Sequence, residues 1–190
     1  VQESCLRKME LSAKNLLSII NDVLDFSKIE SGKLEIEKNT LSIEKLVRDV
    51  VSINEPKAKA ANESFETHID PGIPDVLIGD TLRISQIMLN LVSNAVRYTP
   101  EGGRIDVRWF RTSRGAVLSV KDTGIGIPYE HQNRVFERFY RVDKSHSRAI
   151  GGTGLGLSIV KHAAALHGAE IKLQSQPEDG TVITVLFPGE

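Results

Sequence analysis

The sequence lacks the usual marks of a secreted, membrane-spanning or nucleic-acid-binding protein. Its single cysteine, Cys5, excludes an internal disulfide and a multi-cysteine metal site, so a reducing, cytosolic setting is expected. A net charge of −1 provides no global attraction for nucleic acid, and no nucleic-acid partner is expected. No apolar run reaches the length of a membrane-spanning helix, and there is no signal peptide. The opening "VQESCLRKME" has no initiator methionine, which favours a fragment of a longer protein.

The first 32 residues have the pattern of a long helix in a bundle. Apolar residues recur there at alternating spacings of three and four, and Gly32 is the expected stop. These apolar residues are Leu6, Met9, Ala13, Leu16, Ile20 and Val23. Nothing later in the chain offers a second long heptad helix, so the partner of this face is predicted to be missing or to come from another subunit.

The rest of the chain alternates between strand-like and helix-like patterns. Ser42 and Asp80 are expected to cap helices, Pro56 to end or kink the first of these, and Gly168 to end the last helix of the chain. A further short helix is expected at residues 129–139. Strands are expected at residues 33–38, 64–69, 104–110, 116–122, 170–175 and 181–187, with a hairpin between the last two.

The helix predicted at residues 80–97 carries unusual polar residues. One face is apolar, whereas Asn90, Asn94 and Arg97 follow one another on a second face at spacings of four and three. Asparagine in the middle of a helix works against helix propensity. The two asparagines therefore either form part of a site or are simply solvated.

The stretch "GGTGLGLSIV" at residues 151–160 places glycines just before a predicted helix. It lacks the Gly-Lys-Ser/Thr of a P-loop, and Leu157 stands where a Rossmann motif has its third glycine. What remains is G-x-G-x-G at Gly152, Gly154 and Gly156. Backbone N–H groups at a helix start attract phosphate, although a glycine cluster is also typical of a plain turn.

Four motifs in order resemble the ATP-binding domain of sensor histidine kinases. They are "NLVSNAVRYTPEGG", "DTGIGIP", "FERFY" and "GTGLGL", and the resemblance covers about residues 34–188. The opening helix resembles the second helix of the family's dimerisation and phosphotransfer domain. The resemblance implies a partial dimerisation domain at residues 1–32 and a catalytic domain at residues 33–190. The implied fold is α+β, a two-layer sandwich of a mixed sheet with helices on one face, preceded by the long bundle helix.

The resemblance also implies roles for residues around the nucleotide, with ATP and Mg²⁺ as ligands. Asp122 would accept a hydrogen bond from the adenine amino group, which guanine lacks, although an aspartate in a turn more commonly bonds its own backbone. Asn94 would bind Mg²⁺. Further residues implied at the nucleotide are Asn90, Arg97, Tyr98, Gly124, Gly126, Gly152, Thr153, Gly154, Leu155 and Gly156.

Residues 137–150 resemble the mobile lid of the family. Arg141 is expected to be the lid residue nearest the phosphates, while Arg97 replaces the more usual lysine and still balances phosphate charge. Phe136, Phe139 and Tyr140 are expected to pack the hinge of the lid.

The resemblance implies transfer of the γ-phosphoryl group to a histidine and then to a response regulator. DNA gyrase and MutL share this fold and carry a water-activating glutamate where this chain has Asn90, so hydrolysis should be poor. None of the five histidines lies in the acceptor signature, so the acceptor helix is expected to be absent and autophosphorylation impossible. The full protein is expected to be a homodimer whose cytoplasmic part this is, beneath a membrane-bound receptor. The alternatives are a gyrase- or MutL-like ATPase and a nucleotide-binding module without turnover.

Overall fold

The computed structural model describes Ile20, residues 36–142 and residues 153–189. The chain divides into two compact units, Val1–Glu35 and Ile36–Glu190, and the fold below is that of the second. The bundle helix expected over residues 1–32 lies outside the described residues apart from Ile20, and it stays a prediction. Within the described part of the chain, no helix combines the length and apolar character needed to cross a lipid bilayer.

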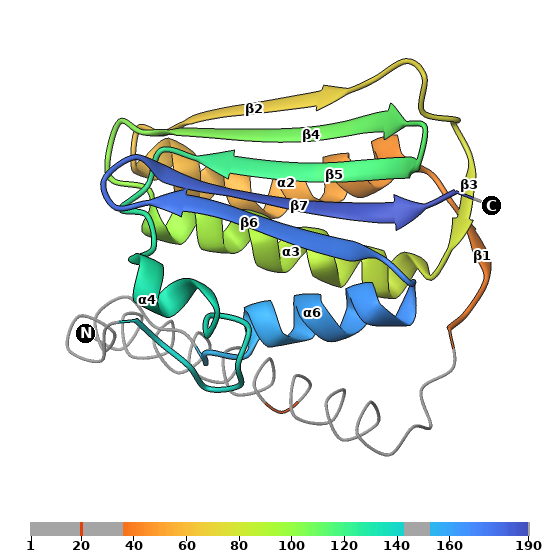
Figure 1. Ribbon diagram of the computed structural model, residues 1–190. Coiled ribbons are helices and arrows are strands. Elements are labelled where there is room, and N and C mark those ends of the chain that lie inside the picture. Colours follow the sequence, from red (N-terminus) through yellow and green to blue (C-terminus); the bar gives the residue numbers. More distant parts are fainter. Residues whose placement is uncertain (1–19, 21–35, 143–152, 190) are drawn as a thin grey trace. The chain divides into compact units, whose positions relative to one another are not determined.

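The second unit is built on a five-stranded mixed sheet with the strand order β2-β4-β5-β7-β6. Strand β2 runs parallel to β4, and the other neighbours are antiparallel. The strands are β2 (Ser64–Ile69), β4 (Arg104–Thr112), β5 (Gly115–Asp122), β6 (Glu170–Gln176) and β7 (Gly180–Pro188). The helices α2 (Ile43–Ala60), α3 (Thr81–Tyr98) and α6 (Gly156–Leu166) all cover one face of this sheet (Figure 1). The predicted α+β fold, with helices on one face of a mixed sheet, is confirmed.

A second, two-stranded antiparallel sheet pairs β1 (Asn39–Leu41) with β3 (Leu77–Gly79). Of the strand predicted at residues 33–38, residues 33–35 lie outside the described residues, and the prediction is wrong over residues 36–38, which precede β1. Leu41 is buried, and this burial favours pairing of Asn39–Leu41, and not of the residues before them, with β3. Strand β3 was not predicted because three residues are too few to show an alternating pattern.

Helix ends follow the predicted caps. The Ser42 hydroxyl accepts the Lys45 N–H at the start of α2, and the Asp80 carboxylate accepts the Arg83 N–H at the start of α3. Pro56 lies inside α2 and does not end it, so of the two outcomes expected at this position, an end or a kink, the first is wrong. A proline removes a single N–H from the helix, and the fully buried Ala58 holds the following turn against the domain.

The core lies between the sheet and α3. Ile105, Val107 and Trp109 alternate along β4 and point toward the helices, and the Trp109 ring stacks on Phe187 of β7 with centroids 5.7 Å apart. Ile87, Met88 and Val92 of α3 are completely buried against this surface. Helix α3 packs against α2, α6 and the sheet, so its position in the fold is fixed from several sides. Segments that bind to α3 are therefore held in place as well.

We expect Glu63→Gln to raise the melting temperature at pH 7. Glu63 is 8% exposed, burial raises its pKa, and its Oε2 has no hydrogen-bond partner among the described residues. For an acid whose pKa is raised by folding, the ionised form weakens the folded state, and this penalty disappears below the pKa of the unfolded chain. Calorimetry should show a gain of about 1–2 °C at pH 7 that vanishes near pH 4. An equal gain at both pH values would contradict the burial of an ionised carboxylate.

Candidate functional site

Helix α3 presents three polar side chains in one stripe. Asn90, Asn94 and Tyr98 follow one another at intervals of one helical turn, and all three remain partly accessible. The Asn90 amide nitrogen donates a hydrogen bond to the Gln86 carbonyl at 2.9 Å, which leaves its amide oxygen facing away from that bond. The Asn94 side chain makes no hydrogen bond to any described residue. The stripe therefore offers amide oxygens to a ligand, in a helix whose other face is core.

Asp122 ends β5 with its carboxylate held in place. One oxygen, Oδ1, accepts the Gly124 N–H at 2.9 Å and the Thr181 N–H at 3.1 Å. Asp122 is 8% exposed, and burial raises its pKa although both N–H groups act in the opposite direction. The bond from Gly124 is the common interaction of an aspartate with its own turn, whereas the bond from Thr181 comes from a different strand. Sequence reasoning missed Thr181, because only the pairing of Asp122 with Thr181 across β5 and β7 reveals it.

The glycine turn after Asp122 is joined to the end of α3. The Ile125 N–H donates to the Tyr98 carbonyl at 3.1 Å. A Cβ atom on Gly124 would lie 2.5 Å from that same carbonyl oxygen, so a larger residue would force the turn away from the helix. Gly124 therefore allows the turn to lie directly against the backbone at the end of α3.

The start of α6 lies against Asn90. A Cβ atom on Gly156 would be 2.8 Å from the Asn90 Oδ1, so glycine allows the two helices to meet at this point. Among the described residues no side chain caps α6, and its first N–H groups have no partner within the helix. Thr153 Oγ1 accepts the Leu155 N–H at 3.1 Å, and the Phe139 N–H donates to the Gly154 carbonyl at 3.0 Å. Leu155 is only 2% exposed, so only its backbone is available to a ligand.

The predicted site residues therefore fall into three segments that meet around α3. Asn90, Asn94 and Tyr98 lie on the helix, Asp122 and Gly124 are attached to its end, and the start of α6 contacts its middle. Gly126 is joined to the β6–β7 hairpin. Gly152 lies outside the described residues, as do most residues of the predicted lid.

The two predicted arginines have different settings. Arg97 is exposed in the last turn of α3, where its positive charge also interacts favourably with the negative end of the helix dipole. Arg141 is partly buried at the edge of the described segment that leads into the lid. Their roles at the phosphates stay predictions.

The segment leading into the lid is only partly helical. The helix predicted over residues 129–139 is limited to α4 (Tyr129–Gln132). The Tyr140 hydroxyl is 2.5 Å from His131 Nδ1, and Arg134 lies over the Tyr140 ring at 4.3 Å, while its role at a lid hinge stays a prediction. Phe139 differs from the expectation, because it is 66% exposed and has a positive φ of 58°.

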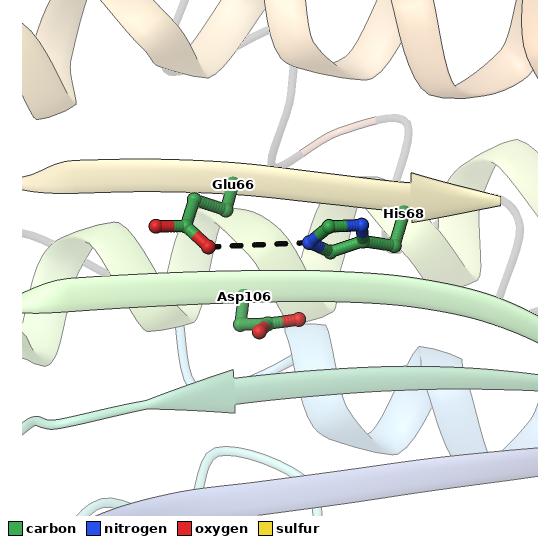
Figure 2. Close-up of side chains that lie close together, drawn as sticks. All are labelled: Glu66, His68 and Asp106. Carbon is green, nitrogen blue, oxygen red and sulfur yellow. Dashed lines mark ion pairs between the residues drawn. The ribbon is translucent and has the colours of Figure 1, made fainter.

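One cluster of potential metal ligands lies away from this site. Figure 2 shows Glu66 and His68 on β2 beside Asp106 on β4, with their ligand atoms within 4.8 Å of one another. Arg108 donates to both oxygens of Asp106, at 2.7 and 2.6 Å, and holds the pKa of that carboxyl below its usual value. Arg104 binds Glu66 at 2.7 Å. Two guanidinium groups already neutralise both carboxylates, so the cluster is an ion-pair network across β2 and β4 and carries no metal assignment.

The comparison with known families decides what kind of domain this is. Residues 79–190, more than half of the chain, match the family described as histidine kinase-, DNA gyrase B-, and HSP90-like ATPase. The chain belongs to this family. The matched range includes the α3 stripe, the Asp122 turn and the start of α6.

Curated relatives of this ATPase domain are histidine kinases. The chain is 40% identical over 185 residues to the signal transduction histidine-protein kinase BarA of Escherichia coli K12, covering 95% of this chain and 20% of that protein. It is 36% identical to the phosphate regulon sensor protein PhoR of Pseudomonas aeruginosa, covering 96% and 41% respectively. The sensory/regulatory protein RpfC of Xanthomonas campestris is also 36% identical, with coverage of 98% and 26%. The chain thus spans between a fifth and two fifths of these relatives.

Solved structures give the same result for the ATPase domain. Full-length ShkA in complex with AMPPNP superposes with a TM-score of 0.79 at 29% identity, covering 92% of this chain and 36% of that one. The catalytic domain of histidine kinase ThkA has a TM-score of 0.69 at 30% identity, covering 80% of this chain and 95% of its own. The predicted resemblance to histidine kinase catalytic domains is confirmed.

Proposed function

We propose that this chain carries the ATP-binding catalytic domain of a two-component sensor histidine kinase. It transfers the γ-phosphoryl group of ATP to a histidine on a helix outside these 190 residues, for relay to a response regulator. The observation that carries the proposal is the attachment of both glycine segments to α3, through Tyr98 at the Asp122 turn and Asn90 at the start of α6. Helix α3 thereby connects Asp122, the proposed hydrogen-bond acceptor for the base, to the start of α6, where the phosphates are proposed to bind.

Asp122 is the proposed recognition group for adenine. Its Oδ1 is engaged by the Gly124 and Thr181 N–H groups, so its second oxygen is the one left to accept the adenine amino group. Guanine has no donor at that position, so the second oxygen of this buried carboxylate would be left without a partner. ATP is therefore the expected nucleotide and GTP the poor one. Gly124 and Gly126 would allow the turn to make room for the base, and Tyr98, 39% exposed, would pack beside the nucleotide.

The phosphates are proposed to bind at the start of α6. Its uncapped N–H groups, next to Thr153, Gly154 and Gly156, attract anions through hydrogen bonds and the helix dipole. Gly152 and Arg141 would add to this phosphate site from the lid side, and Arg97 from α3. The Asn94 amide makes no hydrogen bond to described residues, and an amide oxygen suits Mg²⁺, so this residue fits a metal ligand. Mg²⁺, when bound, would neutralise phosphate charge.

Asn90 favours phosphoryl transfer over hydrolysis of ATP in the proposed mechanism. An amide cannot act as a general base, and its nitrogen is already bonded to the Gln86 carbonyl. The acceptor imidazole nitrogen would form the bond to the γ-phosphorus as the bond to the β–γ bridging oxygen breaks and ADP leaves. Holding the nucleotide in line is thus the main contribution of the domain.

The remaining partners follow from the assignment as a histidine kinase. Residues 1–32 would form part of a dimerisation domain, so the full protein would be a homodimer. It would hold this domain in the cytoplasm beneath a membrane-bound receptor and pass phosphate to a response regulator. These statements rest on the similarity to histidine kinases that are much longer than this chain.

Calorimetric titration with ATP and GTP, with and without Mg²⁺, tests the binding part of the proposal. We expect saturable ATP binding and none for GTP. Heat that continues after saturation would instead indicate an ATPase, and binding of neither nucleotide would contradict the proposed nucleotide site. Transfer is tested by adding the dimerisation domain of the full protein as a separate acceptor and measuring acid-labile phosphate. Labelling of that acceptor supports the kinase, and its absence in the presence of bound ATP contradicts it.

Asn94→Ala should remove the metal-dependent part of ATP affinity. Loss of one amide ligand is expected to weaken binding in Mg²⁺ by about tenfold, roughly 1.4 kcal/mol, with little change in EDTA. The measurement is the same titration in the two buffers. Asn39→Ala on exposed β1 is the matched control and should behave as wild type. Equal weakening of Asn94→Ala with and without Mg²⁺ would assign Asn94 to the nucleotide itself.

A further inference from the structure

The glycine turn is held by more than its own bonds, because Ser175 at the end of β6 is built into it. The Ile127 N–H donates to Ser175 Oγ at 2.8 Å, and that hydroxyl donates to the Gly180 carbonyl at 2.9 Å. Thr181 Oγ1 lies 2.9 Å from Ser175 Oγ. Since the single proton of Ser175 points to Gly180, the Thr181 hydroxyl is the donor in that pair. Every donor and acceptor position of Ser175 is then used.

Gln132 of α4 makes a second connection to the same turn. Its amide nitrogen donates to the Ile127 carbonyl and to the Ser175 carbonyl, each at 2.9 Å. Both amide hydrogens are therefore satisfied, one on the turn and one on β6. Ile127 is bound through its N–H by Ser175 and through its carbonyl by Gln132, so its peptide groups have one orientation.

These contacts lead directly to the carboxylate of Asp122. Thr181 donates its N–H to Asp122 Oδ1 and its hydroxyl to Ser175, so Ser175 and Asp122 share one neighbour. The turn that begins at Asp122 is held at its far end, at Ile127, by the same serine. Both ends of the turn are thus positioned by Ser175.

The residue type at this position is unexpected for the strand. Ile171 and Leu173 occupy the alternate positions of β6 that pack against the core, and Ser175 continues that series. An apolar residue would satisfy the packing pattern at the end of the strand. A hydroxyl stands there instead, with all its hydrogen bonds made to the turn and the adjoining hairpin.

We propose that Ser175 and Gln132 are positioning residues for nucleobase recognition, which hold Thr181 and the glycine turn so that the Asp122 carboxylate meets the base. The inference rests on the proposed function, since it concerns the adenine subsite. It adds that the orientation of Asp122 depends on two side chains that touch neither base nor phosphate. It also connects the base subsite to α4, the helix from which the chain continues toward the lid.

The test compares a ligand that has a base with one that has none. ATP and inorganic tripolyphosphate are titrated in Mg²⁺ into wild type, Ser175→Ala, Ser175→Thr and Gln132→Leu. We expect Ser175→Ala and Gln132→Leu to weaken ATP binding by about tenfold and to leave tripolyphosphate binding unchanged. Ser175→Thr keeps the hydroxyl and should restore ATP affinity. Gln174→Ala, exposed on the same strand, is the control. Urea unfolding of each variant establishes that it is folded under the titration conditions.

The outcomes separate this inference from the function on which it rests. Wild type that binds ATP while Ser175→Ala and Gln132→Leu bind it equally well overturns the positioning role and leaves the proposed function intact. Equal loss for ATP and tripolyphosphate shows a general structural role and also overturns the inference. Wild type that binds no ATP overturns both. If Ser175→Ala does not fold, Gln132→Leu decides the question by itself, because α4 contributes no buried residue to the core.

Discussion

Asp122→Asn is expected to weaken ATP binding by about 100-fold, roughly 2.7 kcal/mol, while the domain remains folded. The amide oxygen of asparagine can still accept the Gly124 and Thr181 N–H groups. Its NH₂ group, however, would present a donor where the adenine amino group also presents one. Because burial raises the pKa of Asp122, the ionised carboxylate weakens the folded state at neutral pH, and the neutral amide removes that penalty. Calorimetry gives the affinity, and circular dichroism shows that the fold is retained.

The pH dependence of binding provides the control for this variant. The raised pKa of Asp122 means that its carboxylate is protonated at a higher pH than an exposed one. Wild-type affinity for ATP should therefore fall as the pH is lowered toward that pKa, whereas Asp122→Asn should show no such step. Asp49→Asn, on the exposed side of α2, should follow wild type. Affinity of Asp122→Asn within threefold of wild type would rule out this carboxylate as the acceptor for the base.

Gly126→Ala is expected to destabilise the domain strongly. Gly126 has a φ of 68°, and a Cβ atom there would lie 1.8 Å from the Gln176 carbonyl oxygen. Neither the turn nor the β6–β7 hairpin can give way without losing the hydrogen bonds between them, so we expect a cost of at least about 3 kcal/mol in unfolding free energy. ATP binding should be lost with it, because the displaced turn begins at Asp122.

Gly102→Ala separates backbone strain from collision. Gly102 also has a positive φ, 79°, but no heavy atom of the described residues lies within 4 Å of the position that a Cβ atom would occupy there. Its replacement should therefore cost only the strain of a left-handed residue, about 1 kcal/mol, with ATP affinity unchanged. Urea unfolding of the two variants measures the difference. Equal costs would show that the hairpin moves freely away from Gly126.

Local features of the fold were predictable because their causes lie within a few residues. Ser42 and Asp80 cap helices through hydrogen bonds that span three residues, and five of the segments predicted as strands correspond to β2, β4, β5, β6 and β7. The errors occurred where distant contacts overrode a local preference. Pro56 is accommodated because Ala58 beyond it is buried, and the first strand begins at Asn39 because it pairs with β3, which is distant in sequence.

The site divides in the same way. Spacing by itself placed Asn90, Asn94 and Arg97 on one face of a helix, and composition by itself indicated two turns rich in glycine. Only the tertiary structure decided what these segments contact. The bond between Asp122 and Thr181 joins residues 59 positions apart, and it exists because β5 and β7 pair in one register. The contact of Gly156 with Asn90 depends on how α6 packs against α3. Side-chain identity and short-range hydrogen bonding depend only on residues that are close in sequence, so they can be predicted from it. Strand register and helix packing are set by burial of the whole core, to which every segment contributes.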